Sequence, residues 1–133
     1  MSLGIYPVFN PKVPEAQFRV LGEVLASECT TLHEIAEANS IASITSFGDN
    51  REIPSDFEGS PDDFDAMLGP FDEWFEPAEA IDAFAALIDV IRTSPYESRN
   101  LDDPESVIEE LAELIRVLTI AERNRSRFHL DMR

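Results

Sequence analysis

The sequence predicts an α+β fold, with three to four helices packed on a small, mainly antiparallel sheet in a single domain of two layers. Two segments in the second half of the chain repeat apolar residues at helical spacing, and each is opened by a proline. Both ends of the chain, residues 3–9 and 128–133, have the composition or the alternation of strands. Because 133 residues would leave two separate cores marginal, one domain over residues 1–133 is expected.

The N-terminal third is expected to hold a strand and two helices. Residues 3–9 are rich in β-formers, and Pro7 has no N–H for a ladder, which favours an edge strand. Apolar residues at helical spacing predict a first helix of about three turns; they are Phe18, Leu21, Val24 and Leu25. Thr31 followed by Glu34 has the form of a capping box, so a second, short helix is expected to end near Asn39. Residues 40–47 fit either a strand or a buried turn of helix.

Two longer helices and a final strand follow. Pro77 suits a first helical position, and the helix it opens should end near Ser94. The next helix should begin with Asp102 or Asp103 as its N-cap, directly before Pro104. The two apolar stripes consist of Ile81, Phe84, Leu87, Ile88 and Ile91, and of Val107, Ile108, Leu111, Leu114, Ile115, Leu118 and Ala121. Residues 128–133 alternate apolar and polar, so they can pair with the N-terminal strand.

Charge limits the classes of partner. A net charge of −17 repels nucleic-acid backbones and anionic bilayers, and it attracts basic proteins. No apolar run is long enough to span a membrane, and the first residues lack a signal-peptide pattern, so a soluble, cytoplasmic protein is expected. The single cysteine, Cys29, cannot form an intramolecular disulfide, which agrees with a reducing compartment.

Most of the negative charge lies in one third of the chain. Residues 48–91 carry thirteen acids against Arg51 alone, a net charge of −12. Residues 48–76 are expected to form a long acidic loop, since glycines and prolines interrupt any regular element. Its aromatic rings are expected to fasten it to the core, because each buried ring contributes about 2 to 3 kcal/mol. The alternative is that Trp74 stays exposed as an anchor for a partner.

Signatures of catalysis and metal binding are weak. Cys29 and His33 are four residues apart, but the capping signal at Thr31 predicts that no single helix carries both. His129 and Asp131 share a strand face that is expected to be solvated or edge-paired. Nucleophile-elbow, phosphate-loop, dinucleotide and zinc motifs are not found, so no catalytic residue, metal or cofactor is assigned.

Calcium is a further alternative for the acidic loop, because hard cations take oxygen ligands. Counted from Asp56, however, the glycine and glutamate positions of an EF-hand loop hold Pro61 and Met67. An irregular site could still use three carboxylates, those of Asp62, Asp63 and Asp65.

The sequence therefore favours a non-enzymatic, acidic module that binds a basic protein partner. The residues assigned to partner binding are Asp62, Asp63, Asp65, Asp72, Glu73 and Trp74. Size and composition are analogous to those of bacterial immunity and antitoxin proteins, which block basic nucleases. The alternatives are a small enzyme or metal-dependent binder that uses His33, His129 or the acidic loop, and a self-associating structural protein. The oligomeric state is expected to be monomer or homodimer.

Overall fold

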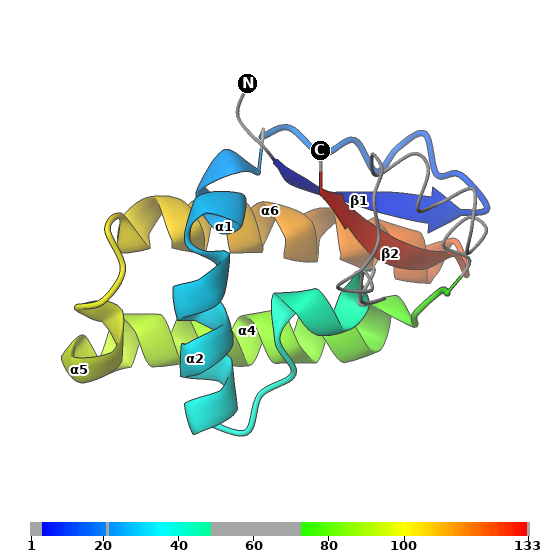
Figure 1. Ribbon diagram of the computed structural model, residues 1–133. Coiled ribbons are helices and arrows are strands. Elements are labelled where there is room, and N and C mark those ends of the chain that lie inside the picture. The colour runs from blue at the N-terminus through cyan, green and yellow to red at the C-terminus, as the bar shows by residue number, and fades with distance from the viewer. Residues whose placement is uncertain (1–3, 21, 49–72, 133) are drawn as a thin grey trace, which may run out of the picture.

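The computed structural model describes residues 4–20, 22–48 and 73–132 (Figure 1). The elements in chain order are β1 (Ile5–Asn10), α1 (Glu23–Ser27), α2 (Cys29–Ala38), the 3₁₀ turn η1 (Ile44–Phe47), α4 (Pro77–Thr93), α5 (Pro95–Ser98), α6 (Pro104–Arg123) and β2 (Arg127–Met132). Helices α4 and α6 lie side by side, and α2 crosses in front of them (Figure 1). The sheet, α1, α2 and η1 share one buried cluster with this helical pair, which confirms the predicted α+β fold.

The two terminal strands form an antiparallel pair, as the sequence predicts. The register places Val8 opposite His129 and Phe9 opposite Phe128. Since side chains alternate across a strand, Ile5, Phe128 and Leu130 face the core, where at most 5% of each is exposed. Tyr6, Val8, His129 and Asp131 therefore share the outer face of the sheet.

The two long helices begin and end where the sequence predicts. Pro77 occupies the first turn of α4, which ends before Ser94. Asp103 caps α6, because its Oδ1 accepts a hydrogen bond of 3.2 Å from the Ser106 N–H. The predicted stripes are buried along the facing sides of the two helices, although Ile81, Ile108 and Ile115 are only partly covered. The short α5 between them was not predicted.

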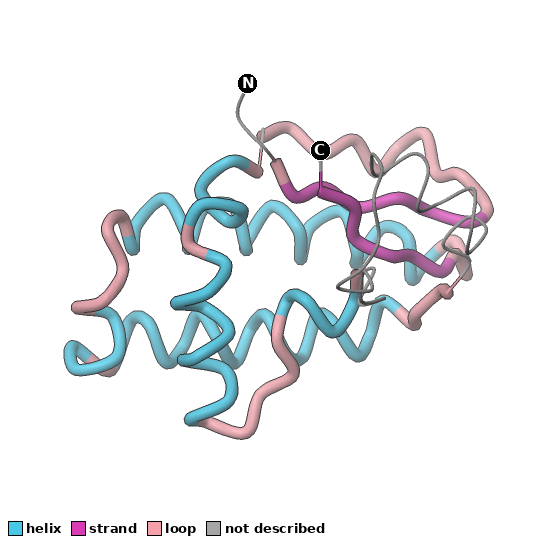
Figure 2. The backbone as a smooth tube through the Cα atoms, viewed as in Figure 1, coloured by secondary structure: helices cyan, strands magenta, loops and turns pink. Residues whose placement is uncertain are grey.

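The prediction of a first helix of about three turns is largely wrong. Only α1 is helical, and residues 11–20 form an extended strap that runs back from β1 toward α1 as a loop (Figure 2). Val13 and Ala16 of this strap are buried against α6, where they form a second small cluster with Val117 and Ala121. Of the predicted stripe, Phe18 packs against this cluster from the strap, whereas Val24 and Leu25 lie in α1. Leu21 lies outside the described residues.

The helix boundary expected at Thr31 is also wrong. Helix α2 begins at Cys29, so Thr31 lies inside it and makes no capping contact, whereas the expected stop at Asn39 is correct. Residues 40–47 form no strand: their second half is the 3₁₀ turn η1, which agrees with the alternative of a buried turn of helix. Of the predicted acidic loop, Gly48 and residues 73–76 are described, and residues 49–72 lie outside the described ranges.

Candidate partner-binding site

The acidic segment is attached at both ends to the same strand. Gly48 forms a parallel bridge with Leu130, and Phe75 forms an antiparallel bridge with Phe128. The Phe75 N–H donates to the Phe128 carbonyl at 2.7 Å, and the Phe128 N–H donates back at 3.0 Å. The described residues on either side of 49–72 therefore meet β2 at positions two residues apart. The edge of β2 that does not pair with β1 therefore forms the base of the segment.

An aromatic cluster packs around this base. The Phe47 ring packs edge-on against Phe75 and Phe84 with centroid distances of 5.6 Å, and it stacks on Phe128 at 5.7 Å. Phe84 and Phe128 are fully buried, and Phe47 is 4% exposed. Edge-to-face and offset pairs of this kind add to the stabilisation from burial alone. Phe75 thus fastens the end of the segment, as predicted, whereas Phe57, Phe64 and Phe71 lie outside the described residues.

Trp74 lies on the outer face of the sheet, directly before the anchored Phe75. Its ring is partly exposed and stacks on His129, with centroids 4.1 Å apart and an interplanar angle of 24°. His129 Nδ1 lies 3.2 Å from the Glu73 carbonyl oxygen. A carbonyl can only accept, so Nδ1 carries the proton in this contact. The indole is therefore neither a core residue nor a freely moving one, because the imidazole supports one side of it.

The prediction that His129 and Asp131 share a solvated or edge-paired strand face is only partly correct. The two side chains do share the outer face, and the edge-paired alternative holds for Asp131, whose Oδ2 accepts from the Tyr6 hydroxyl at 3.1 Å. His129 is not solvated, since only 9% of it is exposed.

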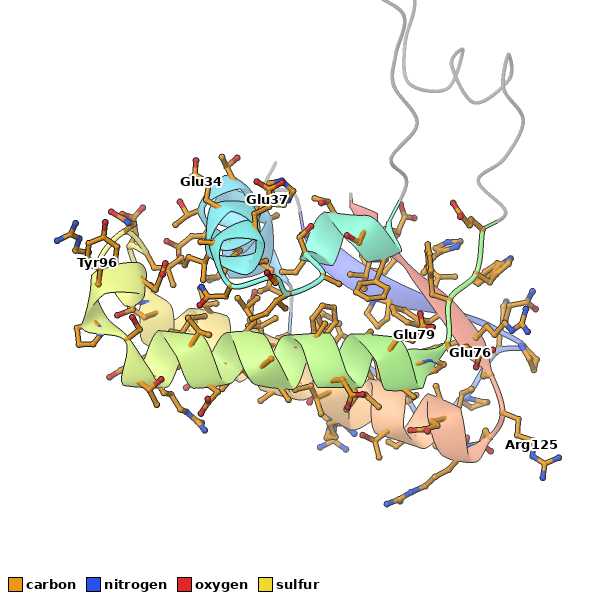
Figure 3. The ribbon with its side chains drawn as sticks, turned by 90° about the horizontal axis from the view of Figure 1, so that it is seen from below. Glu34, Glu37, Glu76, Glu79, Tyr96 and Arg125 are labelled. Atoms are coloured by element: carbon orange, nitrogen blue, oxygen red, sulfur yellow. The ribbon has the colours of Figure 1, made fainter. Side chains whose placement is uncertain are left out.

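Exposed carboxylates lie next to Trp74. We call Glu73, Glu76 and Glu79 the edge carboxylates, since all three are exposed around Phe75 and the first turn of α4. Figure 3 shows Glu76 and Glu79 at this end of α4, with Glu34 and Glu37 on the separate helix α2. Glu76 pairs with Arg127 at 3.0 Å, but both side chains are more than half exposed, so this pair adds little stability. The other acids assigned to partner binding, Asp62, Asp63, Asp65 and Asp72, lie outside the described residues.

The residues proposed for catalysis or metal binding do not converge. Cys29 and His33 share helix α2 after all, but burial raises the pKa of the Cys29 thiol, which opposes a reactive thiolate. His33 and His129 lie on different elements with different partners. Within the described ranges, no three His, Cys, Asp or Glu side chains gather as a metal site would require. The calcium alternative falls on residues outside those ranges.

Three other acids turn inward, and sequence reasoning did not single them out. We call Glu28, Glu110 and Glu113 the inward carboxylates. Glu110 Oε1 accepts the Leu25 N–H at 3.0 Å in the first turn of α1, and Glu28 accepts the N–H groups of Asp102 and Asp103 ahead of α6. One signal was present: Glu110 interrupts the apolar stripe of its helix between Val107 and Leu111.

Comparisons of this chain with family models, with curated proteins and with solved structures find no match. None of the helices within the described ranges combines the length and the apolarity that crossing a bilayer requires.

Proposed function

We propose that this protein is an interaction module that binds a basic protein partner through its acidic 48–79 segment. The observation that carries the proposal is the attachment of both ends of the segment to β2, at Leu130 and at Phe128. Binding loops work best on rigid scaffolds, because less freedom is lost when the partner docks. The aromatic cluster below Phe75 supplies such a scaffold.

The negative charge of the segment determines which partners it attracts. Residues 48–91 have a net charge of −12, and the edge carboxylates are exposed beside the anchor point. A field of this sign steers positively charged proteins toward the site and repels polyanions. The chief effect is on the association rate, so binding should weaken steeply as salt is added.

Trp74 is the proposed anchor within this field. Tryptophan is enriched among the residues that dominate binding energy, and such residues are effective when they are held in place before binding. The stacked His129 ring holds the indole, while part of the indole remains exposed. Loss of a residue with this role typically costs about 2 kcal/mol or more of binding free energy.

Size and composition suggest a more specific form of this role. An acidic single domain that occupies the basic surface of a nuclease would act as an immunity or antitoxin protein. The chain would then work in the cytoplasm as a monomer or homodimer. This finer proposal rests on net charge and chain length.

The test begins with affinity capture by the intact protein from a lysate of its source cells, at low and at high salt. Once a partner is purified, its affinity is measured for wild type, Trp74→Ala and Tyr96→Ala. Tyr96 is the matched control, because it is a large aromatic residue that is 68% exposed at the far end of the molecule (Figure 3). Trp74→Ala should weaken binding by about 30-fold or more, and Tyr96→Ala should not.

The outcomes are separable. A basic partner that is lost at high salt and weakened by Trp74→Ala supports the proposal. Recovery of no basic protein at low salt contradicts the function itself. A basic partner that tolerates Trp74→Ala contradicts the role of this residue.

A further inference from the structure

A chain of four hydrogen-bonding side chains joins α2 to the turn η1. His33 Nε2 lies 3.2 Å from Glu37 Oε1, one helical turn further along α2. His33 Nδ1 lies 3.0 Å from Ser43 Oγ, and Ser43 Oγ lies 2.7 Å from Thr45 Oγ1. We call these side chains the Ser43 relay. They belong to neither the β2 edge nor the acidic segment.

The direction of each hydrogen bond follows from the chemistry of its groups. An ionised Glu37 can only accept, so Nε2 of His33 must carry a proton. A neutral imidazole has one N–H, so Nδ1 then presents a lone pair toward Ser43 Oγ. The Ser43 hydroxyl donates to that lone pair and accepts from Thr45.

This arrangement matches the requirement for an activated nucleophile, in which a hydroxyl lies beside a base that a third group orients. We propose that Ser43 is a nucleophile that takes a small acyl group from a neutral ester, with His33 as the general base. Glu37 is a positioning residue, because it fixes which nitrogen of His33 is the base. The Thr45 hydroxyl donates to the Ser43 oxygen, which leaves the Ser43 hydroxyl oriented toward His33.

Burial and charge define the acyl donor. Because only 5% of Ser43 is exposed, the acyl group that we propose is a short, unbranched one such as acetyl. The His33 side chain is 44% exposed, so the leaving group can approach it from solvent and take up its proton. A net charge of −17 disfavours anionic donors, which is why the proposed substrate is neutral.

The reaction balances without a cofactor. Ser43 Oγ forms a bond to the acyl carbon while its proton passes to His33 Nδ1. The bond from that carbon to the ester oxygen then breaks, and the proton on His33 leaves with the alcohol. Water repeats the sequence, with His33 again as base, and releases the carboxylic acid and free Ser43.

The test uses p-nitrophenyl acetate with the full chain at pH 7.5. The proposal predicts a burst of p-nitrophenolate and an acetyl group that peptide mass spectrometry locates on Ser43. His33→Gln should slow acetylation by about 100-fold or more, the lower range for loss of a general base. Glu37→Gln should slow it less and move the pH profile of acetylation, which a purely structural contact would not do.

Ser46→Ala is the matched control, because Ser46 is an exposed serine on the same turn, and it should react as wild type does. The acetyl group must also be distinguished from simple amine acylation, for which Lys12 is the available side chain. Acetylation confined to Lys12 or the N-terminus would overturn the proposal, and so would acetylation of Ser43 at an equal rate in His33→Gln. Locating the adduct in the wild-type chain keeps the test decisive if a Ser43 variant fails to fold.

Discussion

The inward and edge carboxylates carry the same charge but have different surroundings. The inward set accepts backbone N–H groups, whereas the edge set is exposed. Glu110, 8% exposed, and Glu28, 6% exposed, accept backbone N–H groups where α1 and α6 begin. Glu73 and Glu79 are exposed around the start of α4, near the partly exposed Trp74. The first set holds the fold together, whereas the second set is available to a partner.

The net charge of −17 therefore does not describe a uniform surface, because some of the carboxylates are buried and others are exposed. A buried carboxylate is costly unless hydrogen bonds satisfy it, and the orphan N–H groups at helix starts do so. Glu28 and Glu110 therefore work as caps supplied from another element. Substitutions should separate the two sets clearly, because we expect stability to respond to the inward set and partner binding to respond to the edge set.

The largest effect on stability is expected at Gly22, the residue before α1, whose first turn Glu110 caps. Its φ of 71° is unfavourable for other residues, and a Cβ there would lie 2.0 Å from the Ile5 carbonyl oxygen. Gly22→Ala should lower the free energy of unfolding by more than about 3 kcal/mol, near the upper end for one substitution. Urea denaturation measures this loss.

Gly48→Ala is the control for this prediction. Gly48 has an extended backbone, and its added Cβ would meet the Leu130 carbonyl oxygen at 3.2 Å, so a smaller loss is expected. Equal losses at the two glycines would contradict the steric explanation.

The next effect concerns the inward cap itself. Glu110→Ala leaves the buried Leu25 N–H without its acceptor, which should reduce the free energy of unfolding by about 1 to 3 kcal/mol. The neighbouring Glu109 is exposed, and Glu109→Ala should change it by less than about 0.5 kcal/mol. Thermal or urea denaturation of the pair gives the comparison directly. Similar losses in both variants would show that the two glutamates do not differ in the way their burial indicates.

The stability that Glu113 contributes should depend on pH. The Arg116 side chain donates hydrogen bonds of 2.6 and 2.8 Å to this carboxylate and lowers its pKa, and the Arg19 N–H assists. Since the folded pKa is below the unfolded value of about 4.3, the stabilisation is present above that pH. It is lost as the pH falls through the lower folded pKa. Glu113→Gln should therefore flatten the acid limb of the stability curve.

Urea denaturation at a series of pH values below 5 tests this prediction, with Glu105→Gln as the exposed control. An acid limb in Glu113→Gln as steep as in the wild type would contradict the role of the Arg116 contact.

The smallest effect on stability is expected at the edge. The triple variant Glu73→Gln, Glu76→Gln and Glu79→Gln removes exposed charges, so its free energy of unfolding should stay within about 0.5 kcal/mol per site. Circular dichroism melting curves should nearly coincide with those of wild type. A large loss would mean that these side chains hold the fold and are not reserved for a partner.

The sequence predicts the parts of the fold that depend on local signals. The prolines and the Asp103 cap set the starts of α4 and α6, and alternation identified β2. The strap could not be predicted, because Phe18 and its neighbours pack on α6 and its polar groups bond to α6 side chains far along the chain. Tertiary packing overrode local spacing there.

The candidate site was only partly predictable for the same reason. Composition identified the acidic segment and Trp74, but not the attachment of Gly48 and Phe75 to β2, which depends on pairing across more than fifty residues. The Ser43 relay was also hidden, since Ser43 follows a helix end in a segment that fits two kinds of structure. Inward and exposed glutamates look alike until their partners are known.

The most direct test of the account compares two variants of equal charge. One is the edge triple described above, and the other replaces three exposed acids of α6, as Glu105→Gln, Glu109→Gln and Glu122→Gln. Association rates with the captured basic partner are measured at low salt. The account predicts a marked fall for the edge triple and a small, general fall for the α6 triple. Equal falls in the two variants would contradict it, because net charge alone would then explain the binding.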